Sequence, residues 1–287
     1  MKDNSRELFN VYKDDFEFCK EIIKNNSTSF YIAFSKLPKY EAMSVFAIYA
    51  FCRQADDITD KHDNIEELNK LEEKLIDLEN GIIVNDPVFK ALDVVFKNFS
   101  MSFKPFFEMI KGQRQDFNFM QPNSQKQLED YCYYVAGTVG LMLLPIISKD
   151  SNQSKELAKK IGIAMQITNI LRDIGEDLSN DRVYIPSDLI KQFNVSLDNR
   201  EVNKNFISLW EYEAKIAEDN YNEGIKLIDY LIKEAKEPLM IAINLYHEIL
   251  NVVRKNNYQV FDNRNYVGKI KKASLIRKSL NDLKDNQ

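Results

Sequence analysis

The stretch Gln166–Asp177, QITNILRDIGED, carries oxygen-bearing side chains at helical spacing. Asn169, Asp173 and Asp177 fall at i, i+4 and i+8, so a helix would place them along one face. Isoleucine and leucine occupy most of the other positions, and oxygen atoms in apolar surroundings need partners. Water, a basic side chain or hard cations would satisfy them, and Mg²⁺ prefers oxygen ligands. We call these three residues the second motif.

A similar stretch, CRQADDITD, lies earlier in the chain at Cys52–Asp60. Asp56 and Asp60 are again i and i+4, and we call them the first motif. Each motif has a neighbouring arginine, Arg53 or Arg172. Carboxylates on adjacent turns repel one another unless cations relieve them. The pattern therefore predicts a site for metal ions and a polyanion, and the alternative is a structural aspartate–arginine network without metal.

Phosphate binding by a glycine-rich loop is not indicated, because the chain has neither GxxxxGK nor GxGxxG after a strand. Magnesium and basic side chains would then hold a phosphate group. The C-terminal region offers such side chains, since no acid lies between Asp262 and Asp282. Arg264 and Lys272 are the candidates there to reach an anionic ligand.

Tyrosines gather near both motifs. Tyr49 precedes Asp56 by seven residues, Tyr184 follows Asp177 by seven, and three more precede the sequence GTVG. Tyrosine rings stabilise cations through the ring face. A site that forms carbocations would use some of them.

The bulk composition is that of a globular protein, with 287 residues, 44% hydrophobic and 29% charged. The net charge of −5 argues against nucleic acid as a partner. Three separated cysteines predict reduced thiols and a cytoplasmic protein. The polar opening residues indicate no leader, and apolar runs such as LMLLPII are too short to span a bilayer.

Periods near 3.6 recur along the chain and predict an all-α fold. Four of the eight glycines, Gly137, Gly140, Gly162 and Gly175, lie where helices are expected and predict close approach of helices or of a ligand. No repeat or linker is apparent, so we expect a single domain over 1–287. Helices are expected over about 12–24, 41–60, 64–80, 87–98, 103–119, 124–148, 152–178, 204–233, 236–256 and 268–284.

Three segments, CRQADDITD, YCYYVAGTVG and QITNILRDIGEDLSNDRVYIP, resemble the signature segments of the squalene/phytoene synthases. The resemblance spans nearly the whole chain. Within the family, the chain most resembles the bacterial dehydrosqualene (4,4'-diapophytoene) synthases. The resemblance implies the isoprenoid-synthase helical fold around a central apolar channel.

The resemblance also implies roles for individual residues. Asp56, Asp60, Asn169, Asp173 and Asp177 would hold two or three Mg²⁺ ions, and Tyr49, Tyr133 and Tyr184 would line the reaction pocket. Substrate binding would involve Ser27, Ser29, Phe30, Arg53, Gln166, Arg172, Tyr258, Arg264 and Lys272. Two positions depart from the family: Asn26 stands where histidine is common, and Leu141 where an acid is frequent.

The implied reaction is head-to-head condensation of two farnesyl diphosphates to dehydrosqualene, with Mg²⁺ and without NADPH. An insoluble product would be compatible with peripheral membrane contact and with a downstream carotenoid desaturase. The alternatives are a phytoene synthase that uses geranylgeranyl diphosphate and an NADPH-dependent squalene synthase. A non-catalytic scaffold homologue is a further alternative, but it would be expected to lose motif carboxylates, and all four are present.

Overall fold

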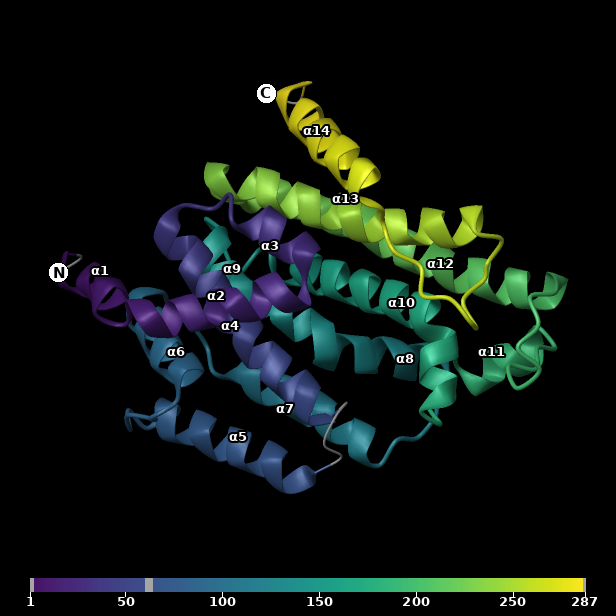
Figure 1. Ribbon diagram of the computed structural model, residues 1–287, viewed down its shortest axis with the longest axis horizontal. Helices are drawn as coiled ribbons and strands as arrows, with labels where there is room; N and C mark the ends of the chain where they lie inside the picture. The colour runs from purple at the N-terminus through teal and green to yellow at the C-terminus, as the bar shows by residue number, and fades with distance from the viewer. Residues whose placement is uncertain (1–2, 60–63, 286–287) are drawn as a thin grey trace. The chain divides into compact units, whose positions relative to one another are not determined.

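The structure is a computed structural model that describes residues 3–59 and 64–285 (Figure 1). Every regular element in these ranges is a helix, and the one extended pairing there is an isolated bridge between Ser148 and Leu231. The predicted all-α class is confirmed.

The chain divides into two compact units, each assembled from three separate stretches. Unit 1 comprises Met1–Asn118, Thr138–Lys155 and Ile228–Leu239, and unit 2 comprises Phe119–Gly137, Glu156–Leu227 and Met240–Gln287. The expectation of a single domain stays a prediction.

Unit 1 is built around α4, which packs against α2, α6, α7 and α9. Ten of the 19 residues of α4 are buried, which explains why its sequence is apolar on nearly every side. The helices of this unit are α1 (Asp3–Val11), α2 (Lys13–Asn26), α3 (Thr28–Phe34), α4 (Lys39–Asp57), α5 (Ile65–Glu79), α6 (Pro87–Asn98), α7 (Lys104–Phe117) and α9 (Thr138–Ile147).

Unit 2 is organised around α10, the helix of the second motif. The single tryptophan, Trp210 of α12, donates from its indole to the carbonyl of Leu171 in α10, at 3.1 Å. The helices that lie wholly or mainly in this unit are α8 (Gln125–Cys132), the π-helix η2 (Tyr133–Gly137), α10 (Lys155–Ser179), α11 (Ser187–Gln192), α12 (Lys204–Gly224), α13 (Lys233–Lys255) and α14 (Lys269–Asp285). The 3₁₀-helix η3 (Ile225–Tyr230) joins α12 to α13.

Side-chain caps fix where several helices begin. Asp86 accepts hydrogen bonds from the amides of Val88 and Phe89 at 2.9 and 3.4 Å, and Pro87 occupies the first turn of α6. Asn203 caps α12 in the same way, through the amide of Phe206 at 3.0 Å. Such caps satisfy the free amides of a first turn.

Several expected boundaries differ from the observed ones. The helix expected over 41–60 ends at Asp57 as an α-helix, and residues 60–63 lie outside the described ranges. The helix expected over 124–148 is interrupted by the π-helical turn η2, and the one over 204–233 ends at Gly224. Three short helices, α1, α3 and α11, were not expected, because short segments carry little periodic signal.

Close approach explains two of the helical glycines. A Cβ atom at Gly162 would lie 2.4 Å from the carbonyl oxygen of Ala136, so α10 touches the backbone of η2 there. At Gly175, a Cβ would lie 2.0 Å from the carbonyl oxygen of Phe261. Both contacts are too short for any other residue without a shift of backbone.

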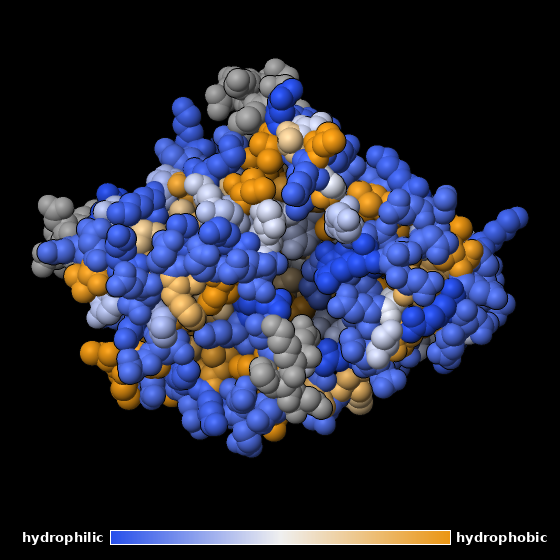
Figure 2. All heavy atoms as spheres, viewed as in Figure 1, coloured by the Kyte–Doolittle hydropathy of each residue, from blue (hydrophilic) through white to orange (hydrophobic). Residues whose placement is uncertain are grey.

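One helical run among the described residues, Gln125–Ile147, is long and apolar enough to cross a membrane by length and composition. Half of its most apolar window is buried, and a helix in the core of a protein can meet the same criteria of length and composition. Sequence reasoning treated this region as too short because it considered LMLLPII alone. Figure 2 shows a face that is hydrophilic over most of its area, with hydrophobic residues in separate groups.

The three cysteines are free and buried, as expected for reduced thiols. Burial raises the pKa of the Cys52 and Cys132 thiols well above the ordinary range. Thiols of this kind are poorly reactive.

Candidate active site

The second motif lies along the polar side of α10. Asn169, Asp173 and Asp177 are half-buried and fall on successive turns, as their spacing predicts. Ile170 and Leu171 between them are buried. The apolar side of the helix therefore fixes its rotation and leaves the oxygen-bearing side chains on the other side.

Asp173 lies between two guanidinium groups. Arg172 donates from Nε to Oδ1 of Asp173 at 2.8 Å and also contacts Oδ2 through Nη2, and each side chain is only 14% exposed. Arg264 reaches the same carboxylate, with Nε–Oδ1 and Nη2–Oδ2 distances of 3.3 Å, and lies 3.3 Å from Glu176. Burial lowers the pKa of Arg172, but the hydrogen bond to Asp173 and the charges of Asp173 and Glu176 together outweigh burial, so the net shift is upward.

Asn169 presents an oxygen that suits a metal ion. Its Oδ1 is buried and has no hydrogen-bond partner among the described residues, while its Nδ2 donates to Oε1 of Gln166 at 3.4 Å. An orphaned amide oxygen beside two carboxylates is a set of hard donors of the kind that Mg²⁺ prefers. The residues present thus fit a magnesium site, although no group of three His, Cys, Asp or Glu side chains in residues 3–59 and 64–285 is arranged to hold one.

Residues 256–268, which join α13 to α14, carry Tyr258 and Arg264, and we call this segment the arm. The Tyr258 hydroxyl donates to Glu211 at 2.8 Å, so the role expected for it in diphosphate binding stays a prediction. Lys272, in the first turn of α14, is half-buried and pairs with no acid among the described residues. Burial lowers the pKa of its ammonium group. An anionic ligand would relieve that cost.

The first motif is held differently. Gln113 of α7, itself buried, donates from Nε2 to Oδ1 of Asp56 at 2.5 Å. Arg53 forms its ion pair with Asp57, one turn further along α4. The role expected for Arg53 in diphosphate binding stays a prediction. Asp60 lies outside the described residues.

The segment NSTSF runs from the last residue of α2, through Ser27, into the first turn of α3. Ser27 caps α3 by accepting from the amide of Phe30 at 3.4 Å, and the Phe30 ring meets Tyr49 of α4 edge-on at 6.2 Å. Ser29 is half-buried in the first turn of α3. Asn26, at the position where the family commonly has histidine, donates to the carbonyl of Ile22 at 2.8 Å. These residues belong to unit 1 together with Asp56.

The remaining candidate tyrosines lie in unit 2. Tyr184 is buried, stacks on Tyr131 at 5.1 Å and meets Phe119 edge-on at 5.1 Å. Tyr133 opens the π-helix η2, and the ammonium of Lys159 lies 5.5 Å from its ring centroid. The Tyr133 ring face therefore already accommodates a cation. π-Helical turns are frequent at functional sites.

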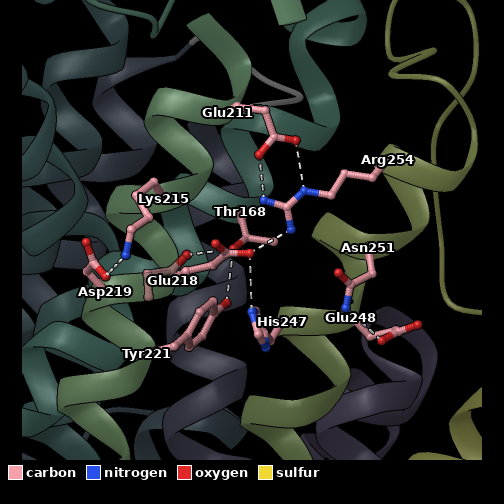
Figure 3. Close-up of polar contacts among 11 residues, drawn as sticks. Thr168, Glu211, Lys215, Glu218, Asp219, Tyr221, His247, Glu248, Asn251 and Arg254 are labelled. Carbon is pink, nitrogen blue, oxygen red and sulfur yellow. Dashed lines mark hydrogen bonds and ion pairs between the residues drawn. The ribbon is translucent and has the colours of Figure 1, made fainter. Parts of the chain in front are cut away.

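A charged network on α12 and α13 supports α10, and sequence reasoning missed it (Figure 3). Arg254 donates to both carboxylate oxygens of Glu211 at 2.9 and 2.8 Å, and to Glu218 at 2.6 Å. Its guanidinium lies 5.5 Å from the Trp210 ring centroid. The hydrogen bond from Arg254 lowers the pKa of Glu211. Only the helical spacing of 211 and 218 could have indicated the pairing.

A second polar contact joins α12 to α10. Tyr221 of α12 and Thr168 of α10 share a hydrogen bond of 3.0 Å (Figure 3). Both side chains are buried, and burial raises the pKa of Tyr221. Thr168 is the residue before Asn169, so this bond lies directly behind the second motif.

The predicted site residues therefore fall into two sets. One set in unit 1 comprises Ser27, Ser29, Phe30, Tyr49, Arg53 and Asp56, and the other in unit 2 comprises Tyr133, Gln166, Asn169, Arg172, Asp173, Asp177, Tyr184, Tyr258, Arg264 and Lys272. Within unit 2 the structure brings Arg172 and Arg264 onto Asp173, which sequence distance alone did not indicate.

Comparison with known proteins places the chain in a family. The sequence model described as squalene/phytoene synthase matches residues 23–271. A 4,4'-diapophytoene synthase of Staphylococcus haemolyticus is 34% identical over 282 residues, which covers 95% of this chain and 99% of that protein. A phytoene synthase of Arthrospira platensis is 34% identical over 283 residues, 92% of this chain and 91% of the other.

The solved structures agree. The crystal structure of a dehydrosqualene synthase in complex with ligand matches with a TM-score of 0.95 and 46% identity, covering 97% of this chain and 99% of the other. The predicted isoprenoid-synthase helical fold is thereby confirmed. The chain belongs to the squalene/phytoene synthase family.

Proposed function

We propose that this protein joins two farnesyl diphosphates head to head, through a cyclopropyl (presqualene) diphosphate, to give dehydrosqualene for carotenoid biosynthesis. The observation that carries the proposal is the polar side of α10, where an orphaned amide oxygen and two carboxylates lie beside Arg172 and Arg264. The similarity to a diapophytoene synthase and to a dehydrosqualene synthase supports a thirty-carbon product.

The reaction balances without a redox partner. The C–O bond of one donor breaks and its diphosphate leaves, the double bond of the second donor attacks the allylic cation, and loss of a proton closes the cyclopropane. The second C–O bond then breaks, the skeleton rearranges, and a second proton leaves. NADPH is therefore not required, whereas squalene would need a hydride.

Basic side chains bind and orient the diphosphate groups in this proposal. Arg172, Arg264 and Lys272 supply charge-assisted hydrogen bonds, which are about twice as strong as neutral ones. Rings such as those of Tyr133 and Tyr184 stabilise the cations through their faces. Either a tyrosine or the departing diphosphate accepts the proton.

The donor set of the two motifs is suited to magnesium. Asp56, Asp60, Asn169, Asp173 and Asp177 would hold two or three ions, which supply positive charge to the departing diphosphate.

The alternatives within the family differ in donor or in reductant. The similarity to a phytoene synthase keeps geranylgeranyl diphosphate as the second candidate donor. A non-catalytic scaffold role is disfavoured, because the chain keeps all four motif carboxylates.

Mass spectrometry of the hydrocarbon made by the purified protein separates these functions. Dehydrosqualene from farnesyl diphosphate and Mg²⁺, equally with and without NADPH, is the expected result. Squalene formed only with NADPH, or phytoene formed only from geranylgeranyl diphosphate, would overturn the assignment of product. Absence of product from every donor would favour the scaffold role.

For location, we propose a cytoplasmic enzyme that delivers its insoluble product at an anionic membrane surface, where a carotenoid desaturase would consume it. Tyr266 and Ile270 are 77% and 90% exposed beside the basic first turn of α14. Flotation with phosphatidylglycerol vesicles should capture the protein, and Ile270→Ser should reduce capture. Equal recovery with and without vesicles would contradict it.

A further inference from the structure

The second motif and the arm are joined at one turn of α10. In a regular helix the amide of Gly175 would bond only to the carbonyl of Leu171. Here the Leu171 carbonyl accepts the Trp210 indole at 3.1 Å, and the Gly175 amide donates to the carbonyl of Val260 at 3.2 Å. This turn therefore shares its backbone groups with α12 and with the arm.

Gly175 is the point of closest approach in this junction. A Cβ atom there would lie 2.0 Å from the carbonyl oxygen of Phe261 and 2.5 Å from its carbonyl carbon and Cα. These are backbone atoms, so rotation of a side chain cannot relieve the contact. Any larger residue must push the arm away from α10.

The arm itself is internally fixed. Asn265, only 3% exposed, accepts from Nδ2 of Asn256 at 2.6 Å and donates to the carbonyl of Gln259 at 2.8 Å. Phe261 is buried with its ring 5.0 Å from that of Phe206. A displacement at Phe261 would therefore move the neighbouring residues together with it, including Arg264.

Two consecutive residues with left-handed backbone start the arm. Asn257 and Tyr258 have φ values of 52° and 57°, which are unfavourable for residues other than glycine. The Tyr258 hydroxyl bond to Glu211 and its edge-on contact with Trp210 at 5.3 Å stabilise this conformation. Tyr258 thus helps to set the direction in which the arm leaves α13.

From these contacts we infer that Gly175 is a positioning residue: its missing side chain seats the arm against the second motif and so places Arg264 over Asp173 for diphosphate binding. The identity of the ligand in this inference rests on the proposed function, whereas the contact between Gly175 and the arm does not. It assigns a task to a glycine that lies between two acids and contributes no functional group of its own.

The test is a double-mutant cycle with Gly175→Ala and Arg264→Ala. Displacement of a binding group by about 1 Å can cost about 10²-fold in kcat/KM, so Gly175→Ala should show a large loss, mainly in KM for farnesyl diphosphate. If Gly175 acts through Arg264, adding Arg264→Ala to Gly175→Ala should change kcat/KM by less than about twofold, because interacting residues are not additive. Independent, multiplicative losses would overturn the inference.

A binding readout keeps the test separate from catalysis. Trp210 is the only tryptophan and touches both Leu171 and Tyr258, so its fluorescence can report binding of inorganic diphosphate with Mg²⁺. Gly175→Ala should weaken this binding at least tenfold, and Gly224→Ala is the control for adding a methyl group to a closely packed helical glycine. Gly224 also has a close contact, with Ile161, but lies away from the arm, and its variant should bind as the wild type does.

The outcomes distinguish the two proposals. If the wild type binds diphosphate at least tenfold more tightly than Gly175→Ala does, yet forms no hydrocarbon, the proposed function fails and the positioning role stands. If Gly175→Ala binds diphosphate as tightly as the wild type, the positioning role fails whatever the product.

Discussion

The two acidic motifs look alike in sequence but are neutralised in different ways. Asp173 is held by two guanidinium groups, one from its own helix and one from the arm. Asp56 accepts a neutral amide from Gln113, and the nearby Arg53 pairs with Asp57. An arginine next to a motif in sequence is therefore not a reliable guide to which carboxylate it neutralises. The comparison shows that Arg172 and Arg264, two of the proposed diphosphate-binding residues, pair with the second motif.

The largest expected effect is loss of the motif carboxylates. Asp173→Ala and Asp56→Ala should each lower kcat by about 10²–10³-fold or more. Each would remove an oxygen ligand of the magnesium ions, whose positive charge would stabilise the departing diphosphate. Steady-state kinetics with Mg²⁺, together with circular dichroism, measures this. Asp219→Ala, which removes an exposed acid paired with Lys215, is the matched control and should keep full activity. Retained activity in both motif variants would disprove the metal assignment.

Gln113 provides the next largest effect and acts on the first motif alone. Gln113→Leu should lower kcat/KM by about 10–100-fold, the usual cost of losing a partner that orients a metal ligand. Diphosphate binding without Mg²⁺ should not change, since the partner described for Gln113 is Asp56 of the first motif. Activity within twofold of the wild type would show that Asp56 needs no orienting partner.

Glu213 is a buried acid that pairs with no cation among the described residues. It is fully buried in α12, and burial raises its pKa from 4.5 to about 7. Between these values the folded state binds more protons than the unfolded state, so the free energy of unfolding should fall as pH rises through this window. The full effect is on the order of 3 kcal/mol.

Urea unfolding of wild type and Glu213→Gln at pH 5 and pH 8 measures this contribution. The variant should lose most of the pH dependence that the wild type shows across the window. If the free energy of unfolding changes equally between pH 5 and pH 8 in the two proteins, Glu213 does not titrate in this window.

The smallest effect concerns the support behind the second motif. Tyr221→Phe removes the hydroxyl bonded to Thr168 and should lower the free energy of unfolding by about 1 kcal/mol. Thr168 keeps its bond to the carbonyl of Ala164, so α10 should stay intact and activity should change little. A large loss of activity at unchanged stability would mean that this bond sets the position of Asn169.

The sequence indicated the all-α class and the polar side of α10 correctly, because both depend on local periodicity. Gln113, Trp210 and Arg254 could not be found that way. Their partners lie 57, 39 and 43 residues away in the chain, and no local pattern encodes such pairings. Gly175 is intermediate: its place between two acids indicated a close approach, but only the structure shows that the arm makes it. The interruption of the helix at η2 was also missed, since a π-helical turn scarcely alters apolar spacing.

Binding of inorganic diphosphate in the presence of EDTA, measured by calorimetry, tests the difference between the motifs most directly. Asp173→Asn should bind more tightly than the wild type, because Arg172 and Arg264 lose the carboxylate that neutralises them. Asp56→Asn should change the affinity much less, since the contact described for Asp56 is with the neutral amide of Gln113. Equal affinities of Asp173→Asn and the wild type would contradict the claim that Asp173 neutralises the arginines of unit 2.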